Sequence, residues 1–119
     1  MVTVSDRVGE HDFEVLRRLV LPDGAVLRCR LPARPTADCL FRDVSRDGAT
    51  ALKLWNMNAV TGVVGVFNLQ GASWSIKCRN YHIHDARPKP LRVVVRPQDV
   101  PYLPPAGAYA LWSDAAKAS

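Results

Sequence analysis

The fold is decided by the stretch LKLWNMNAVTGVVGVFN, which spans residues 52–68. Two apolar runs, 51–55 and 62–68, are rich in aliphatic and aromatic side chains, and the segment 56–61 between them carries the Asn and Thr residues that favour loops. We therefore predict that the two runs form strands and pair as an antiparallel hairpin. A helix in either run would contradict this interpretation.

The alternation of side chains along the first of these strands fixes which residues share a face. Successive side chains of a strand point to opposite sides of its sheet. Leu52 and Leu54 should therefore lie on one face, and Lys53 and Trp55 should lie on the other.

Further strand patterns lie on both sides of this hairpin. The segment 91–96 is a strong strand candidate, 76–78 and 81–83 are weaker ones, and 108–112 is a candidate for the last strand. A short strand is also expected at 25–29. The sequence thus predicts a mostly β fold.

One helix is expected, near the amino terminus, from Gly9 to Leu21. Phe13, Leu16 and Val20 recur there at helical spacing, and Pro22 follows. A strand–helix unit cannot bury its apolar face without neighbouring strands and helices. The front of the chain is therefore expected to be part of something larger, with a boundary near Pro32–Pro35.

Composition and charge exclude several classes of partner. The net charge is +5, but the 16 Lys and Arg residues are dispersed and no nucleic-acid motif accompanies them, so no nucleic-acid partner is expected. No apolar run approaches the roughly 20 residues that span a bilayer, so no membrane partner is expected. The three cysteines lack disulfide or zinc spacing, which indicates a cytoplasmic protein, or a plastid one if a lost amino terminus carried a transit peptide.

A series of motifs along the chain is similar, in the same order, to a known family. They are VSD (4–6), HDF (11–13), LVLPDG (19–24), RPT (34–36), DCLF (38–41), RDG (46–48), LKLWNMN (52–58), TGVVGVFN (61–68) and QGA (70–72). The chain resembles the raffinose synthases, seed-imbibition proteins and plant alkaline α-galactosidases of glycoside hydrolase family 36. The likeness covers residues 4–100 and fades after Pro101, and Ala33, Ala37, Val44, Ala59 and Leu69 depart from the family pattern.

The resemblance implies a (β/α) barrel followed by an antiparallel β-sandwich domain. Residues 1–31 would be the last strand–helix unit of an incomplete catalytic barrel, and residues 32–119 would be part of the carboxy-terminal β-domain. The implied reaction moves an α-galactosyl group from galactinol or an α-galactoside to sucrose or water, without a cofactor. The implied ligand of the full-length parent is therefore an oligosaccharide or galactinol.

The reaction of this family needs two carboxylates, a nucleophile and a general acid/base, about 5–5.5 Å apart. In the family both lie on earlier barrel strands, and no position of this chain matches them. We therefore assign no catalytic residue and expect a carboxy-terminal fragment that is inactive alone.

Asp6 is the one residue for which we expect sugar contact. It follows the apolar start of the chain, so it would lie at the carboxyl end of the last barrel strand, where such barrels build their active sites. Capping of the following turn and helix is the competing interpretation, and it is favoured.

Other side chains have the chemistry to bind a metal ion or a sugar, but we interpret them as structural. His82, His84 and Asp85 have the spacing of metal ligands, but further ligands are lacking and the family implies no metal, so no metal site is assigned. The three tryptophans and the loop amides could contact sugar. Core packing and turn geometry are the favoured interpretations. These residues are Trp55, Trp74, Trp112, Asn56, Asn58, Asn68 and Gln70.

The alternative to an enzyme fragment is a stand-alone β-rich module that binds carbohydrate or protein. The helix distinguishes the two. If Phe13, Leu16 and Val20 pack onto a complete core, the chain is a module, and if they are exposed, it is a piece of a barrel. Self-association through exposed apolar surface is expected in the second case.

Overall fold

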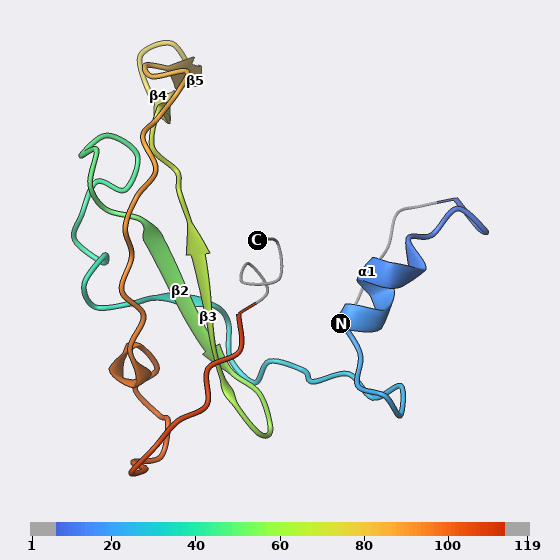
Figure 1. Ribbon diagram of the computed structural model, residues 1–119. Helices are drawn as coiled ribbons and strands as arrows, with labels where there is room; N and C mark the ends of the chain where they lie inside the picture. Colours follow the sequence, from blue (N-terminus) through green and yellow to red (C-terminus); the bar gives the residue numbers. More distant parts are fainter. Residues whose placement is uncertain (1–6, 114–119) are drawn as a thin grey trace.

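The computed structural model describes residues 7–113, which form two small antiparallel sheets and one short helix (Figure 1). In chain order the elements are α1 (Phe13–Arg18), β1 (Arg34–Pro35), β2 (Leu52–Met57), β3 (Gly62–Phe67), β4 (Ala72–Ser75), β5 (Asn80–Ile83) and the 3-10 turn η1 (Pro97–Asp99). The strand order is β1-β2-β3 in one sheet and β4-β5 in the other. The predicted mostly β fold with one amino-terminal helix is confirmed. The barrel, the sandwich and the domain boundary remain predictions.

The predicted central hairpin is confirmed as β2 and β3. The strands pair antiparallel, from Leu52 opposite Phe67 to Met57 opposite Gly62. The connection is tight because Asn58 closes it: its Oδ1 accepts the amides of residues 60 and 61 at 2.8 and 2.7 Å. Its amide nitrogen also donates to the Thr61 hydroxyl at 2.8 Å. The predicted turn role of Asn58 is therefore confirmed.

The predicted alternation along β2 is also confirmed. Lys53 and Trp55 are buried on one face, and Leu52 and Leu54 are half-buried on the other. The Trp55 ring packs edge-on against Tyr102, with 5.6 Å between ring centroids. The core is small, because Cys39, Ala51, Trp55 and Val100 are the buried apolar residues of the described chain.

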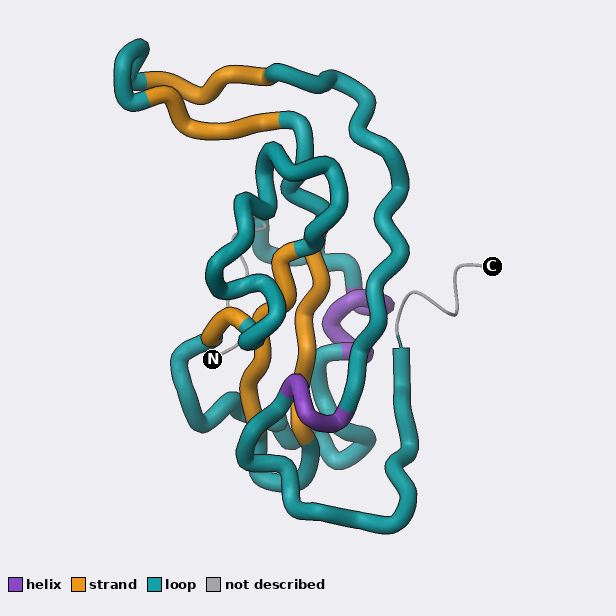
Figure 2. The backbone as a smooth tube through the Cα atoms, turned by 90° about the vertical axis from the view of Figure 1, so that its left-hand side faces the viewer, coloured by secondary structure: helices purple, strands orange, loops and turns teal. Residues whose placement is uncertain are grey.

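The predicted strand at 91–96 is wrong. The segment is extended but pairs with no strand, and it runs back along the sheet from the β4–β5 hairpin (Figure 2). Prolines at 88, 90 and 97 flank it and lack amide donors. Both edges of β2 are already taken by β1 and β3. The segment attaches to β2 through a side chain: Lys53 Nζ donates to the Val94 carbonyl at 3.0 Å.

Three other strand predictions need correction. The segment 76–78 is the turn between β4 and β5, where Cys78 N donates to Ser75 Oγ at 3.3 Å. The predicted strand at 81–83 is confirmed within β5. The segment 25–29 is exposed and has no strand beside it. The segment 108–112 forms no strand either, and Tyr109 turns its hydroxyl back onto the Pro104 carbonyl at 2.7 Å.

The helix α1 is shorter than predicted and stands apart from the sheets (Figure 1). Asp12 caps it, with Oδ1 accepting the amides of Glu14 and Val15 at 3.0 and 3.1 Å. No residue of α1 is buried, and Phe13 is 61% exposed. The predicted span of 9–21 is therefore wrong, because no packing partner supports turns beyond the six capped residues. Across residues 7–113, no helix has the length and apolar character needed to cross a bilayer.

Gly71 joins the two sheets. Its amide donates to the Ser45 carbonyl at 3.1 Å, and its own carbonyl accepts the amides of His84 and Asp85 at 2.8 and 3.0 Å. Its φ of 99° lies in the region that favours glycine. A Cβ on Gly71 would collide with the Asp85 carbonyl oxygen. The orientation of the β4–β5 hairpin therefore depends on the absence of a side chain here.

We predict that Gly71→Ala lowers the free energy of unfolding by about 3 kcal/mol, because left-handed strain and the collision with a backbone carbonyl add together. Gly48→Ala is the matched control. Gly48 also has a positive φ, of 68°, but open space surrounds the added Cβ, so strain alone of about 1 kcal/mol should remain. Urea unfolding followed by tryptophan fluorescence measures both, and equal losses in the two variants would contradict the role of Gly71.

Candidate functional site

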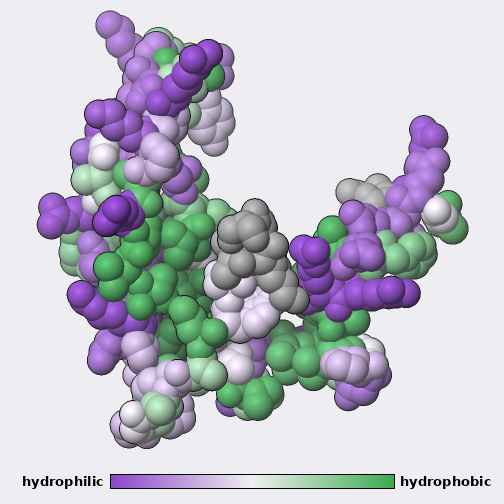
Figure 3. All heavy atoms as spheres, viewed as in Figure 1, coloured by the Kyte–Doolittle hydropathy of each residue, from purple (hydrophilic) through white to green (hydrophobic). Residues whose placement is uncertain are grey.

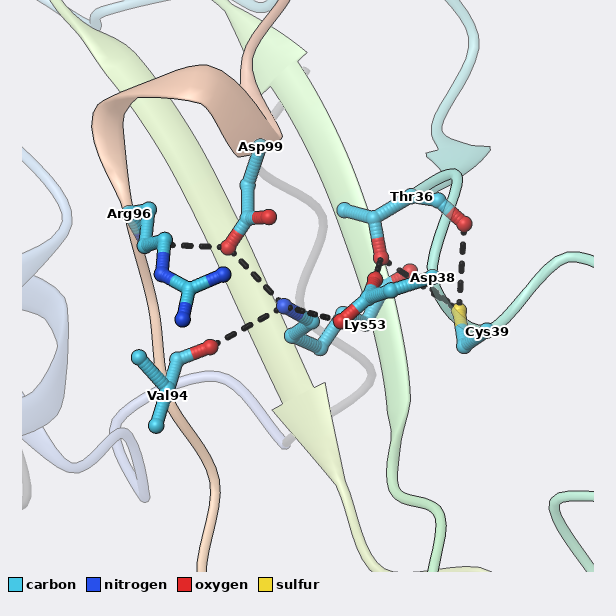
Figure 4. Close-up of polar contacts among 7 residues, drawn as sticks. All are labelled: Thr36, Asp38, Cys39, Lys53, Val94, Arg96 and Asp99. Atoms are coloured by element: carbon cyan, nitrogen blue, oxygen red, sulfur yellow. Dashed lines mark hydrogen bonds and ion pairs between the residues drawn. The ribbon is translucent and has the colours of Figure 1, made fainter.

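Lys53 forms the most connected polar cluster of the described chain. Its side chain is only 5% exposed, and its ammonium lies 2.7 Å from Asp38 Oδ2 and 2.9 Å from Asp99 Oδ2. The third contact is the Val94 carbonyl at 3.0 Å. An ammonium has three N–H donors, so each donor has an acceptor. Figure 4 shows the three acceptors converging on Nζ from different segments.

A second ring of contacts holds Asp38 in place. Thr36 is buried, and its hydroxyl donates to Asp38 Oδ1 at 2.6 Å. The Thr36 amide donates to the Lys53 carbonyl at 3.0 Å, which continues the pairing of β1 with β2. The Cys39 thiol lies 3.4 Å from the Thr36 hydroxyl and from the Lys53 carbonyl oxygen. Backbone and side chain of Lys53 are thus both tied to the segment that follows β1.

The cluster stays charged across the neutral pH range. The hydrogen bond from Lys53, followed by that from Thr36, holds the pKa of Asp38 below its ordinary value. Burial disfavours the charged form of Lys53. The hydrogen bonds and charges of Asp38 and Asp99 outweigh this effect and raise the pKa of Lys53 above its ordinary value.

This charge state decides what the two converging carboxylates can do. A glycosidic general acid must hold its proton near neutral pH, which requires a raised pKa. Asp38 has a lowered pKa, and an ammonium binds both Asp38 and Asp99. The pair is therefore a structural ion cluster. It has neither the free nucleophile nor the protonated acid that the reaction needs.

The residues singled out in the sequence lie elsewhere. Asp6 lies outside the described residues. His84 Nε2 lies 3.0 Å from the Ser45 carbonyl, which anchors the root of the β4–β5 hairpin. In the described part of the chain, no three His, Cys, Asp or Glu side chains come together as metal ligands would. His84 thus serves the attachment of the hairpin.

The tryptophans divide into one core residue and two exposed ones. Trp55 is 5% exposed, as its core role predicted. Core packing is the wrong prediction for Trp74 and Trp112, which are 52% and 68% exposed. Trp74 meets Tyr81 edge-on at 5.2 Å on the β4–β5 hairpin. The hairpin is too small to bury this pair, and nothing in the described chain covers it.

The loop amides serve local structure, as predicted for them. Asn56 bonds both backbone groups of Leu31, donating to its carbonyl at 2.6 Å and accepting its amide at 3.2 Å. Gln70 donates to Asp47 at 2.8 Å and accepts the Gly48 amide at 2.9 Å. Asn56 and Gln70 thus bond backbone groups of neighbouring loops and stabilise the conformation of those loops.

Sequence reasoning missed the Lys53 cluster. One signal was present, because Lys53 shares its predicted face with Trp55, and a lysine beside a core aromatic requires a buried counter-ion. The partners were not identifiable, because Asp38 lies in a turn and Asp99 in the short 3-10 turn η1, and neither has a sequence pattern that points to Lys53.

We predict that Lys53→Met lowers the free energy of unfolding by about 3 kcal/mol, because Asp99 would remain poorly solvated without its cation. The matched control, Lys89→Met on the surface, should change it by less than about 0.5 kcal/mol. Urea unfolding measures both, and similar values for the two would contradict the role of Lys53.

The stability difference between wild type and Lys53→Met should depend on pH. The contribution of Asp38 is present above its ordinary pKa of 3.8 and is lost as pH falls through its lowered pKa. That of Lys53 is present below 10.5 and is lost as pH rises through its raised pKa. The gap in stability between wild type and Lys53→Met should therefore be widest from about pH 5 to pH 9 and narrow at both extremes, while Lys53→Arg should retain most of the wild-type profile.

Comparison with known proteins identifies the family. Residues 1–115 match the family model described as raffinose synthase or seed imbibition protein Sip1. The chain is 50% identical, over 95% of its length, to the probable galactinol–sucrose galactosyltransferase 1 of Arabidopsis thaliana. It is 50% identical over 83% of its length to the galactinol–sucrose galactosyltransferase of Oryza sativa subsp. japonica, and 49% identical over 61% to the stachyose synthase of Pisum sativum.

The chain is short beside these relatives. It spans 15% of the Arabidopsis protein, 13% of the rice protein and 9% of the pea protein. The match nevertheless covers almost every residue of this chain, including the Lys53 cluster and both sheets. The chain therefore belongs to the raffinose synthase and seed imbibition protein family.

Proposed function

We propose that this chain is part of a longer protein that transfers an α-galactosyl group from galactinol to sucrose. The observation that carries the proposal is its 50% identity, over 113 residues, to a probable galactinol–sucrose galactosyltransferase. Relatives from rice and pea with related names support the same substrate class. The ligands of the full-length protein would then be galactinol and an oligosaccharide acceptor.

Within that protein we assign this part an architectural role. The transfer requires an ionised nucleophile and a protonated acid close together. The carboxylates that converge in residues 7–113 both bind Lys53, and the pKa of Asp38 is lowered by its hydrogen bonds to Lys53 and Thr36. The chain would therefore supply a stable β-rich layer, while the reacting carboxylates come from other parts of the protein.

The exposed apolar surface supports a place within a larger assembly. Phe13 on α1 is 61% exposed, and Leu19, the residue that caps the end of α1, is 49% exposed. Leu16 and Val20 are only half-buried. Figure 3 shows apolar residues gathered over the sheet and along the segment that joins it to α1. The radius of gyration is 17.2 Å, against about 13.5 Å for a compact domain of this length. These features favour the enzyme part over the stand-alone module.

We predict that the purified chain neither transfers galactose from galactinol to sucrose nor hydrolyses an α-galactoside. The full-length protein, assembled from its complete transcript, should form raffinose under the same conditions. Chromatography of the sugars measures both reactions. Turnover by the short chain that survives repurification would contradict the architectural role, and a full-length protein without transfer activity would contradict the proposed reaction.

We also predict that the chain self-associates, because each large apolar side chain left in water forgoes about 1.5–3 kcal/mol of burial. It should bind a hydrophobic dye and elute as a species larger than its 13.2 kDa on sizing. Replacing Phe13 of α1 and its C-cap residue Leu19 by Ser should reduce both signals, while replacing the polar neighbours Glu14 and Arg17 by Ser should not. A monodisperse monomer without dye binding would favour the module instead.

A further inference from the structure

A cleft of about 570 Å³ lies beside the Lys53 cluster, between the loop that follows β1 and the extended segment before η1. This volume is within the range of about 300–1,000 Å³ that is usual for small-molecule sites. Its lining is strongly charged and includes Asp38, Arg42, Asp47, Lys53, Arg92 and Arg96. The cleft thus combines room for a small molecule with four cations and two carboxylates.

The carboxylates of the cleft are already engaged. Asp38 accepts from Lys53 and Thr36. Asp47 Oδ1 accepts the amides of residues 49 and 50 at 2.9 and 2.8 Å and the Gln70 amide group at 2.8 Å. Hydrogen bonds from Thr50 and from the amides of residues 49 and 50 hold the pKa of Asp47 well below its ordinary value. Both carboxylates are therefore ionised and already hold hydrogen-bond donors of the protein.

The three arginines of the cleft are not engaged in this way. Lys53 is saturated by Asp38, Asp99 and Val94. Within residues 7–113, the ion pairs at the cleft involve Lys53, and no carboxylate pairs with Arg42, Arg92 or Arg96. Figure 4 shows the contact of Arg96 running from its backbone amide to Asp99, while its guanidinium has no partner among the residues drawn.

Three guanidinium groups that form no ion pair within residues 7–113 lie at one cleft, and they define the ligand chemistry. Each presents a rigid fork of donors that matches the paired oxygens of a phosphate. A neutral sugar makes no use of that charge, and a free phosphate ion fills only a fraction of the space. We propose that this cleft binds the phosphate group of a small phosphate ester, such as a hexose phosphate, through Arg42, Arg92 and Arg96. This site is separate from the proposed galactosyl transfer and does not depend on it.

Calorimetric titration of the 119-residue chain tests the proposal, with glucose 1-phosphate as the hexose phosphate, inorganic phosphate as the bare anion and glucose as the neutral sugar. Glucose 1-phosphate should bind with a dissociation constant in the millimolar range or below, weakening several-fold from 50 to 300 mM salt. Tight binding of inorganic phosphate would support the same anion site with the phosphate as its main determinant. Equal binding of glucose, or no binding of either phosphate at 10 mM, would overturn the proposal.

Paired variants locate the site. Arg92→Gln with Arg96→Gln should weaken glucose 1-phosphate binding at least tenfold, whereas Arg28→Gln with Arg87→Gln removes the same charge outside the cleft and should leave binding unchanged. Arg92→Lys with Arg96→Lys keeps the charge without the fork and should give an intermediate affinity. Far-UV circular dichroism and thermal melts compare the fold of the variants. Equal losses in the two Gln pairs would show non-specific charge attraction and overturn the proposed site.

Discussion

The structure depends on the burial of one positive charge. An ammonium taken out of water is costly unless acceptors replace its hydration, so the 5% exposure of Lys53 requires Asp38, Asp99 and the Val94 carbonyl around it. These acceptors come from both sides of the β2–β3 hairpin in the sequence. The apolar core is small, so the Lys53 cluster contributes to holding the segments outside the strands against the sheet.

The parts of the fold that could be predicted are those set by neighbouring residues. The β2–β3 hairpin follows from two apolar runs and a closing Asn58, which interact within a few positions. The failures concern segments placed by distant contacts. Residues 91–96 have the composition of a strand, yet flanking prolines and a side-chain contact from Lys53 keep the segment out of the sheet. The Lys53 cluster could not be predicted for the same reason, because Asp38 and Asp99 have no local pattern that points to Lys53.

The charge states in the structure also limit its chemistry. Hydrogen bonds from Lys53 and Thr36 lower the pKa of Asp38, and the carboxylates of Asp38 and Asp99 raise the pKa of Lys53 against the opposing effect of burial, which suits a permanent ion cluster. The cluster holds the segments that form the cleft walls, and the arginines on those walls form no ion pair within residues 7–113.

The Lys53–Asp99 contact spans 46 positions, and this separation bears on the order in which the chain folds. Contacts between distant residues carry a larger loop-closure entropy and form late. During synthesis on the ribosome, Lys53 leaves the exit tunnel well ahead of Asp99. The β2–β3 hairpin can therefore pair while its lysine is still hydrated, and the charge becomes buried only when η1 arrives. Lys53 would then be a hydrated surface charge on the early hairpin and a buried attachment point in the finished fold.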